Sequence, residues 1–187
     1  MWQTQPMNEL SVACAEHLAG EDEEAVLALL EETEGEFVPP LSKRTSTHQT
    51  DLSTPAASDR TGVEAYFAEL AGQPFLLARE GRRFAGFLSY IRGFDAGWIR
   101  LGADAVYITT ICTAPEFRHR GVASALYRAL EKRICPSAML IRTWSTNGAQ
   151  RSLLEKGGYR MVRCLADDRG PGIDTLYYLK ELGQASI

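Results

Sequence analysis

The sequence predicts a single-domain α/β fold, because it contains a central strand–helix unit, a second such unit after it and a hairpin before it. Residues 105–113 (AVYITTICT) are rich in β-branched and aromatic side chains, Pro115 ends the run, and apolar residues recur at helical spacing after Gly121. Strand, helix and strand patterns follow within 139–165, and two strands around a tight turn occupy 74–92. The 187 residues, 45% of them hydrophobic, suit one core and are too few for two ordinary domains.

The elements are expected in the order β-α-α-β-β-β-α-β-α-β-β. The two early helices each carry one apolar stripe, and the last two strands pair across a turn at 167–172. The expected strands are 10–14, 74–79, 83–92, 105–113, 139–143, 159–165 and 175–182, and the expected helices are 22–32, 62–71, 123–134 and 148–156.

Residues 39–61 interrupt this order. The segment is rich in Ser, Thr and Pro and has almost no apolar periodicity, which is typical of a long loop or a disordered segment. We expect it to be mobile. Its role is left open between a lid over a site and a flexible insertion.

The segment between the central strand and its helix is suited to a diphosphate. A helix N-terminus carries unpaired N–H groups and a partial positive charge, so it attracts anions. Gly121, which has no Cβ, and the small Ala123 let phosphate oxygens approach the backbone. The segment consists of Arg118, His119, Arg120, Gly121, Val122 and Ala123, followed by Ser124.

Two blocks of the sequence resemble the signatures of the GNAT superfamily of acetyl-CoA-dependent N-acetyltransferases. The first block, Arg118, Gly121 and Ala123, falls on the pattern [Q/R]-x-x-G-x-[G/A]. The second falls on N-(x)5-L-Y-E-K-x-G-[F/Y], except that Leu154 replaces the tyrosine that many members use as a general acid. Its matching residues are Asn147, Leu153, Glu155, Lys156, Gly158 and Tyr159. The resemblance covers 105–162 and implies a mixed, mostly antiparallel, twisted sheet, splayed at the central strand, with helices on both faces.

The resemblance also implies where acetyl-CoA binds as co-substrate. The pantetheine arm would lie along the backbone of Ile111, Cys112 and Thr113, with the N–H of Ile111 as the oxyanion donor. A fixed donor of this kind contributes about 3 kcal/mol in the transition state. The diphosphate would take the N–H groups of 119–123 and the Ser124 hydroxyl, beside Arg118 and Arg120, unless these two are ordinary surface arginines. Asn147 would cap the next helix, reach the cofactor arm, or do both.

The sequence offers few candidates for the base that deprotonates an amine. Relatives with a catalytic carboxylate have a glutamate four residues before the oxyanion donor, and Tyr107 occupies that place here. Tyr107 is therefore expected either to line the cleft or to be a half-buried aromatic with its hydroxyl in water. Cys112 is a poor nucleophile candidate, because no histidine is placed to activate it and strand alternation directs it into the core.

Other residue types argue against several classes of site. The four cysteines are scattered and form no C-x-x-C pair, and the three histidines are scattered as well. We therefore expect no zinc or other metal and no disulfides, and we expect the cysteines to be buried thiols. The sequence has no export signal and no apolar segment near 20 residues, so a cytoplasmic protein without membrane association is expected. A net charge of −4 gives no indication of nucleic-acid binding.

Charge is distributed unevenly between the two halves. Residues 1–42 contain ten acids and no Lys or Arg, whereas 118–163 contain ten bases and two acids. A basic half suits a ligand with several phosphates and an acidic half suits a cationic partner, unless both are solvated helix faces. We therefore expect an N-acetyltransferase acting on a small-molecule or peptide amine of cationic character, with a homodimer as one conceivable assembly. The alternative is a catalytically degenerate module that binds acyl-CoA.

Overall fold

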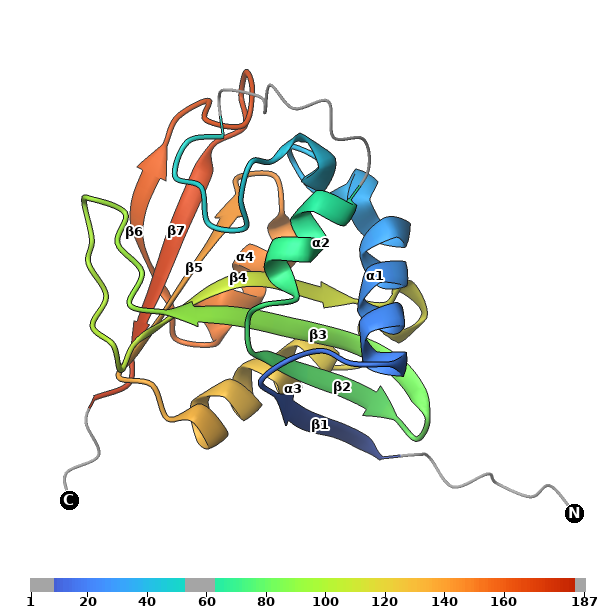
Figure 1. The fold of residues 1–187 in the computed structure, drawn as a ribbon. Helices are drawn as coiled ribbons and strands as arrows, with labels where there is room; N and C mark the ends of the chain where they lie inside the picture. The colour runs from blue at the N-terminus through green and yellow to red at the C-terminus, as the bar shows by residue number, and fades with distance from the viewer. Residues whose placement is uncertain (1–8, 53–62, 184–187) are drawn as a thin grey trace, which may run out of the picture.

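The structure, a computed structural model, describes residues 9–52 and 63–183 and centres on a seven-stranded sheet (Figure 1). The strands lie in the order β1-β2-β3-β4-β5-β7-β6, and β4 with β5 is the parallel pair among antiparallel ones. Their bounds are β1 Leu10–Ala15, β2 Phe75–Glu80, β3 Arg83–Arg92, β4 Val106–Thr113, β5 Ala138–Trp144, β6 Arg160–Leu165 and β7 Thr175–Glu181. The predicted α/β fold class, the mixed, mostly antiparallel sheet and the succession of elements along the chain are confirmed.

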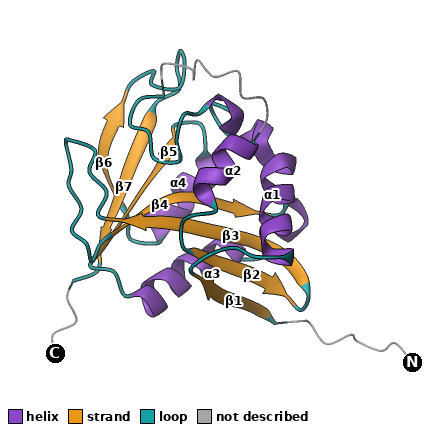
Figure 2. Cartoon of the chain, in the orientation of Figure 1, coloured by secondary structure: helices purple, strands orange, loops and turns teal. Residues whose placement is uncertain are grey.

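Helices cover both faces of the sheet. Figure 2 shows α1 (Glu21–Thr33) and α2 (Glu64–Leu70) in front of the strands, with α3 (Val122–Ala129) and α4 (Gly148–Lys156) behind them. A π-helical turn, η4 (Leu130–Ile134), continues α3, and short 3-10 turns occupy η1 (Glu34–Glu36), η2 (Leu41–Lys43) and η3 (Pro115–Phe117).

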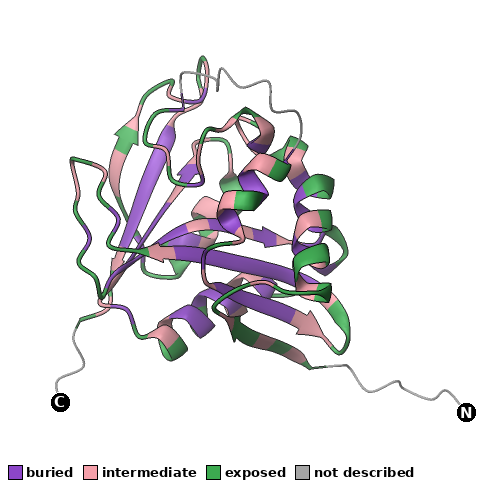
Figure 3. Cartoon of the chain, in the orientation of Figure 1, coloured by how far each residue is buried: buried purple, intermediate pink, exposed green. Residues whose placement is uncertain are grey.

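Two apolar clusters hold these layers together, and the residues coloured as buried in Figure 3 concentrate along the central strands. The larger cluster joins the helices to the sheet, with Val26, Leu70 and Leu126 among its members. The smaller cluster lies at the β5–β7 side and contains Phe94, Tyr107 and Tyr177. The sheet is therefore anchored on both sides of the point where β4 and β5 separate.

The strands β4 and β5 separate partway along their length. Their pairing runs from Val106–Met139 to Ile108–Ile141 and then stops, although β4 continues to Thr113 and β5 to Trp144. On the other side, the register of β4 against β3 shifts so that Thr109 is an extra residue, a β-bulge. The predicted splay at the central strand thus begins at a bulge.

The first part of the predicted loop, residues 39–52, packs on the domain. It has little regular structure, as expected, but Leu41 and Thr47 are fully buried and Leu52 is nearly so. Polar contacts hold it, such as the Thr47 N–H donating to Glu69 of α2 at 3.0 Å, which explains why no apolar periodicity marks it. The rest of the predicted loop, 53–61, lies outside the described residues.

The cysteine expectation needs correction. Cys112 is buried, but Cys14, Cys135 and Cys164 are exposed, because they lie on an edge strand, after η4 and on the edge strand β6. No helix in the described part of the chain has both the length and the apolar character required to cross a membrane.

Candidate functional site

A cavity of about 660 Å³ opens where β4 and β5 separate. Its walls are the splayed ends of both strands, the loop before α3, the start of α4 and residues from η1 to η2. Ile111, Cys112, Thr113, Arg118, His119, Gly121, Val122, Ala123, Ser124 and Asn147 line it, so the structure brings together all the predicted cofactor residues except Arg120.

The free edge of β4 presents backbone donors to this cavity. The N–H of Ala114 donates to the carbonyl of Ala85, next to β3, at 3.0 Å. Because N–H directions alternate along a strand, the N–H groups of Ile111 and Thr113 point away from β3, toward the gap that β5 leaves. An extended ligand could therefore pair with β4 as a further strand would.

The loop before α3 supplies a second set of donors. Gly121 adopts φ +82°, a left-handed conformation that favours glycine, and a Cβ there would meet no atom within 4 Å. The first backbone bond of the helix is Ala125 N–H to the Gly121 carbonyl, so the N–H groups of 121–124 have no acceptor among the described residues. This end of the cavity is suited to a phosphate.

The two arginines of the loop have different surroundings. Arg118 lines the cavity, and its Nη2 lies 2.9 Å from Oε1 of Glu36. Arg120 pairs instead with Glu80 and lies over the Phe117 ring, outside the cavity lining. The alternative of an ordinary surface arginine therefore fits Arg120, and Arg118 fits the ligand role.

Asn147 combines the two roles left open for it in the sequence. Its side-chain oxygen accepts from the N–H of Gln150 at 3.2 Å and caps α4, and the residue also lines the cavity. Leu154, one residue after the lining residue Leu153, is itself buried in the larger cluster and does not line the cavity.

Tyr107 does not line the cavity, which corrects the expectation that it faces the cleft or water. The bulge at Thr109 places Tyr107 on the same side of β4 as Thr110 and Cys112 rather than with Ile111. The residue is fully buried, its ring stacks on Phe94 at 4.1 Å, and burial raises the pKa of its hydroxyl to about 12. Tyr107 therefore cannot be the base that takes a proton from an amine.

Cys112 behaves as predicted from strand alternation. Its side chain is 7% exposed and its sulfur lies 3.2 Å from the Thr33 hydroxyl. Burial raises the pKa of the thiol to about 11, so the nucleophilic thiolate is scarce at neutral pH. Cys112 can therefore form part of the cavity wall and contribute its backbone, but it does not supply a nucleophile.

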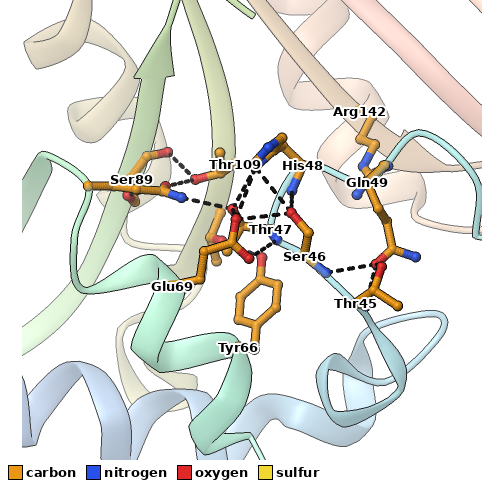
Figure 4. Close-up of polar contacts among 12 residues, drawn as sticks. Thr45, Ser46, Thr47, His48, Gln49, Tyr66, Glu69, Ser89, Thr109 and Arg142 are labelled. Carbon is orange, nitrogen blue, oxygen red and sulfur yellow. Dashed lines mark hydrogen bonds and ion pairs between the residues drawn. The ribbon is translucent and has the colours of Figure 1, made fainter. Parts of the chain in front are cut away.

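A polar network runs from the bulge to α2 and the packed segment (Figure 4). The Thr109 hydroxyl donates to Oε1 of Gln73 at 2.6 Å, and Nε2 of Gln73 donates to the Thr47 hydroxyl at 2.8 Å. The Thr47 hydroxyl in turn donates to the Glu69 carboxylate at 3.0 Å, which His48 also contacts. Glu69 only accepts hydrogen bonds, so each hydroxyl and amide of the network donates toward it. The Thr109 hydroxyl therefore uses its hydrogen on Gln73, and its oxygen lone pairs remain available as acceptors in the cavity wall.

Three arginines of the cavity wall escaped the sequence analysis. Arg44 follows η2, Arg142 lies on β5 just after the last residue that pairs with β4, and Arg169 lies in the β6–β7 connection. They are far apart in the sequence and belong to no motif, so only the fold brings them together.

The charged side chains of the described cavity wall are mostly arginines, although the sequence led us to expect a cationic acceptor. Glu36 is the one carboxylate in the described lining, and Arg118 already neutralises it. Glu21, Glu23, Glu24, Glu31 and Glu32 lie exposed along α1, as solvated helix faces do. Among the described residues there is no group of three or more His, Cys, Asp or Glu side chains that could hold a metal.

An open strand edge and a helix N-terminus in one cavity define an α/β protein suited to an elongated, phosphate-bearing ligand. Residues 40–159 match the acetyltransferase (GNAT) family, which is more than half of the 187 residues. The chain therefore belongs to the GNAT family, as its motifs predicted, and it is an acyltransferase by class.

Solved structures share this fold at low sequence identity. The ribosomal-protein-S18-alanine N-acetyltransferase of Escherichia coli has a TM-score of 0.63 and 13% identity, over 95% of this chain and 97% of that one. The yncA protein of Salmonella typhimurium, solved with acetyl-CoA, has a TM-score of 0.65 and 15% identity, over 95% and 96%. The ribosomal-protein-alanine N-acetyltransferase of Brucella melitensis has a TM-score of 0.65 and 16% identity, over 91% and 99%. Comparison with the curated proteins gave no match.

Proposed function

We propose that the chain transfers the acetyl group of acetyl-CoA to a primary amine, on a small molecule or as an exposed amino group, by direct attack of the amine. The observation that carries this proposal is the shared cavity of the open β4 edge and the α3 N-terminus. A structural neighbour solved with acetyl-CoA, the Salmonella typhimurium yncA protein, supports the choice of co-substrate.

The residues present fit this co-substrate. The N–H groups of 121–124 and the Arg118 guanidinium would bind its diphosphate, and the N–H groups of Ile111 and Thr113 would align its extended arm. Bound acetyl-CoA supplies a thioester carbonyl. The N–H of Ile111 is directed into the gap, where it can stabilise negative charge that develops on an acyl oxygen, a contribution of about 3 kcal/mol.

A second candidate is the degenerate acyl-CoA-binding module. Two observations favour it: Leu154 is buried where many relatives have a tyrosine acid, and the described cavity wall has no carboxylate other than the paired Glu36. Neither is decisive, since a thiol with a reference pKa near 8.5 leaves without much help from an acid.

The test combines binding and turnover. Titration calorimetry should detect acetyl-CoA binding to the parent and none to Gly121→Glu, because the added carboxylate would occupy the diphosphate site. Gly97→Glu is the matched control, since Gly97 also has a positive φ (+78°) and open space around it, in a loop away from the cavity. Equal affinity in parent and Gly121→Glu would remove the site assignment. Binding with no thiol release across a panel of amines would favour the module.

A further inference from the structure

We propose that the acceptor amine also carries an anionic group, a carboxylate or a phosphonate, which is held by the guanidinium groups of Arg44, Arg142 and Arg169. This inference rests on the proposed function and specifies its substrate class. The three residues, called the arginine cluster below, all line the cavity.

The groups that bind the arginine cluster within the protein are neutral. Arg44 Nε donates to the Pro39 carbonyl at 3.2 Å, and Arg142 donates to the Gln49 carbonyl. Arg169 donates through Nε to the Thr175 hydroxyl at 2.9 Å and through Nη1 to the Val38 carbonyl. No carboxylate forms an ion pair with any of the three within residues 9–52 and 63–183.

Several donors of the arginine cluster lack partners. Nη2 of Arg44 and Nη2 of Arg142 are buried and have no hydrogen-bond partner among the described residues. Buried charges are stable in proteins when they are paired and hydrogen-bonded, and an unmet donor costs about 1–3 kcal/mol. The arrangement is therefore complementary to an oxyanion that accepts several hydrogen bonds.

The pKa values within the arginine cluster shift in different directions: burial lowers the pKa of Arg142, but the nearby Tyr107 and Tyr177 outweigh it, so the net shift is upward. Burial, together with the charges of Arg44 and Arg142, lowers the pKa of Arg169 to about 9, and burial lowers the pKa of Arg44 to about 10. Asp168 opposes this shift at Arg169 but accepts its hydrogen bonds from the Leu52 N–H and the Thr175 hydroxyl. All three arginines stay protonated at neutral pH, and their mutual repulsion decreases when an anion binds.

The arginine cluster lies apart from the proposed diphosphate site. The diphosphate loop follows the end of β4 and leads into α3, which runs behind the sheet, whereas Arg44 belongs to the segment that packs with α2 in front of the sheet (Figure 1). Aromatic rings fix two of the guanidinium groups: Arg44 lies 5.5 Å from the Phe37 ring and Arg169 lies 5.4 Å from the Trp144 ring. The anion they bind is thus assigned to the acceptor rather than to the co-substrate.

The arginine cluster also bears on how the amine loses its proton. An ammonium has a reference pKa near 10.4, and nearby positive charges lower that value. An acceptor held by its anionic group would place its ammonium in the field of three guanidinium groups. The neutral, nucleophilic amine is then favoured although the described wall has no unpaired carboxylate. A polycationic acceptor would instead be repelled, so the expectation of a cationic acceptor is replaced.

Matched amine pairs test the inference with the full chain. L-Leucine is compared with isoamylamine, and 2-aminoethylphosphonate with ethylamine, by thiol release from acetyl-CoA. We expect kcat/KM to be at least about tenfold higher for the anionic member of one pair, since charge-assisted hydrogen bonds are the strong ones. The pair that shows the preference identifies the anion as carboxylate or phosphonate. If isoamylamine reacted at least as fast as L-leucine, and ethylamine at least as fast as 2-aminoethylphosphonate, the inference would be overturned.

Variants locate the effect in the arginine cluster. Arg142→Met and Arg44→Met lie on different elements, and Arg100→Met is the control, because Arg100 is 83% exposed and pairs with Asp95 outside the cavity. We expect the anion preference to fall to about twofold or less in the first two and to persist in the control. Acetyl-CoA affinity should stay within about twofold of the parent in all three, by calorimetry. A parallel loss of acetyl-CoA affinity would reassign the arginine cluster to the co-substrate phosphates and overturn the inference.

Inorganic phosphate separates this inference from the proposed function. Because phosphate can also bind at the α3 N-terminus, the measurement is made with that site blocked: phosphate should raise the Tm of Gly121→Glu but not of Gly121→Glu combined with Arg142→Met or with Arg44→Met, since binding to the native state stabilises it. If acetyl-CoA failed to bind while this pattern held, the proposed function would fail and the anion site would stand. If acetyl-CoA bound while phosphate raised every Tm equally, the anion site alone would fail.

Discussion

Glu36 is the residue whose replacement best separates a catalytic base from a simple ion pair. It is the one carboxylate in the described cavity wall, and its Oε1 lies 2.9 Å from Nη2 of Arg118. A carboxylate that lines an acyltransfer cavity is a natural candidate for the base. We predict instead that Glu36→Gln leaves kcat within about threefold of the parent, because the carboxylate is occupied by Arg118 and the arginine cluster favours a neutral amine.

The size of the effect on binding follows from exposure. The side chains of Glu36 and Arg118 are 55% and 36% exposed, so water and salt screen their attraction, which is expected to be about 0.2–1 kcal/mol. Releasing Arg118 for the diphosphate can therefore tighten acetyl-CoA binding by about fivefold at most. The gain should shrink as ionic strength rises, since exposed charges are screened over about 8 Å at physiological salt.

The assay measures kcat and KM for both substrates across pH, together with the acetyl-CoA Kd by calorimetry. Glu32→Gln is the matched control, because Glu32 is an exposed acid of α1 outside the cavity wall. General-base catalysis contributes about 10² to 10⁴-fold. A kcat loss above about a hundredfold in Glu36→Gln, with the control unaffected, would refute this reasoning and make Glu36 the base.

Three further changes have defined outcomes. Leu154→Tyr should change kcat by less than about tenfold, because the departing thiolate needs little help from an acid. A kcat gain above about a hundredfold would show that the parent lacks an acid that catalysis needs. The Tm of the variant must be followed, since overpacking a buried site costs about 1–3 kcal/mol. Asn147→Ala should lower the free energy of unfolding by about 1 kcal/mol through loss of the cap to Gln150, and Asn147→Asp should restore it, as checked by urea unfolding. Iodoacetamide at pH 8 should not label Cys112, because its thiol is buried and has a pKa of about 11. Mass mapping should find the label on the exposed Cys14, Cys135 and Cys164. Labelling of Cys112 at the rate of these exposed thiols would contradict the packing.

Features encoded locally were accessible from the sequence. The central strand, the glycine that begins α3 and the Asn147 cap each depend on residues within one or two turns of chain, so composition and spacing located them. The β3 strand was predicted at the bounds it has, Arg83–Arg92, because a tight turn and β-branched and aromatic residues mark it. The family signature then implied the splay between β4 and β5.

Features that depend on long-range contacts were not accessible. The bulge at Thr109 leaves no mark in an apolar run, yet it determines on which side of β4 Tyr107 lies. Residues 39–52 pack through polar contacts to Glu69 and Gln73, so their composition suggested only a loop. Arg44, Arg142 and Arg169 converge from three separate parts of the chain, two of them in connections and one on β5, so charge counted along the chain did not indicate that they meet.

The bulge links both halves of the proposed site. Before it, β4 pairs with β5 and closes the sheet, and after it, the N–H groups of Ile111 and Thr113 face an open gap. The bulged residue itself, Thr109, is tied at 2.6 Å to Gln73 and through it to the segment that carries Arg44. Since one residue sets both the end of strand pairing and the attachment of that segment, the co-substrate edge and the arginine cluster are held in a fixed relation. This placement allows an amine anchored by its anionic group to face the open edge of β4 without a dedicated carboxylate base.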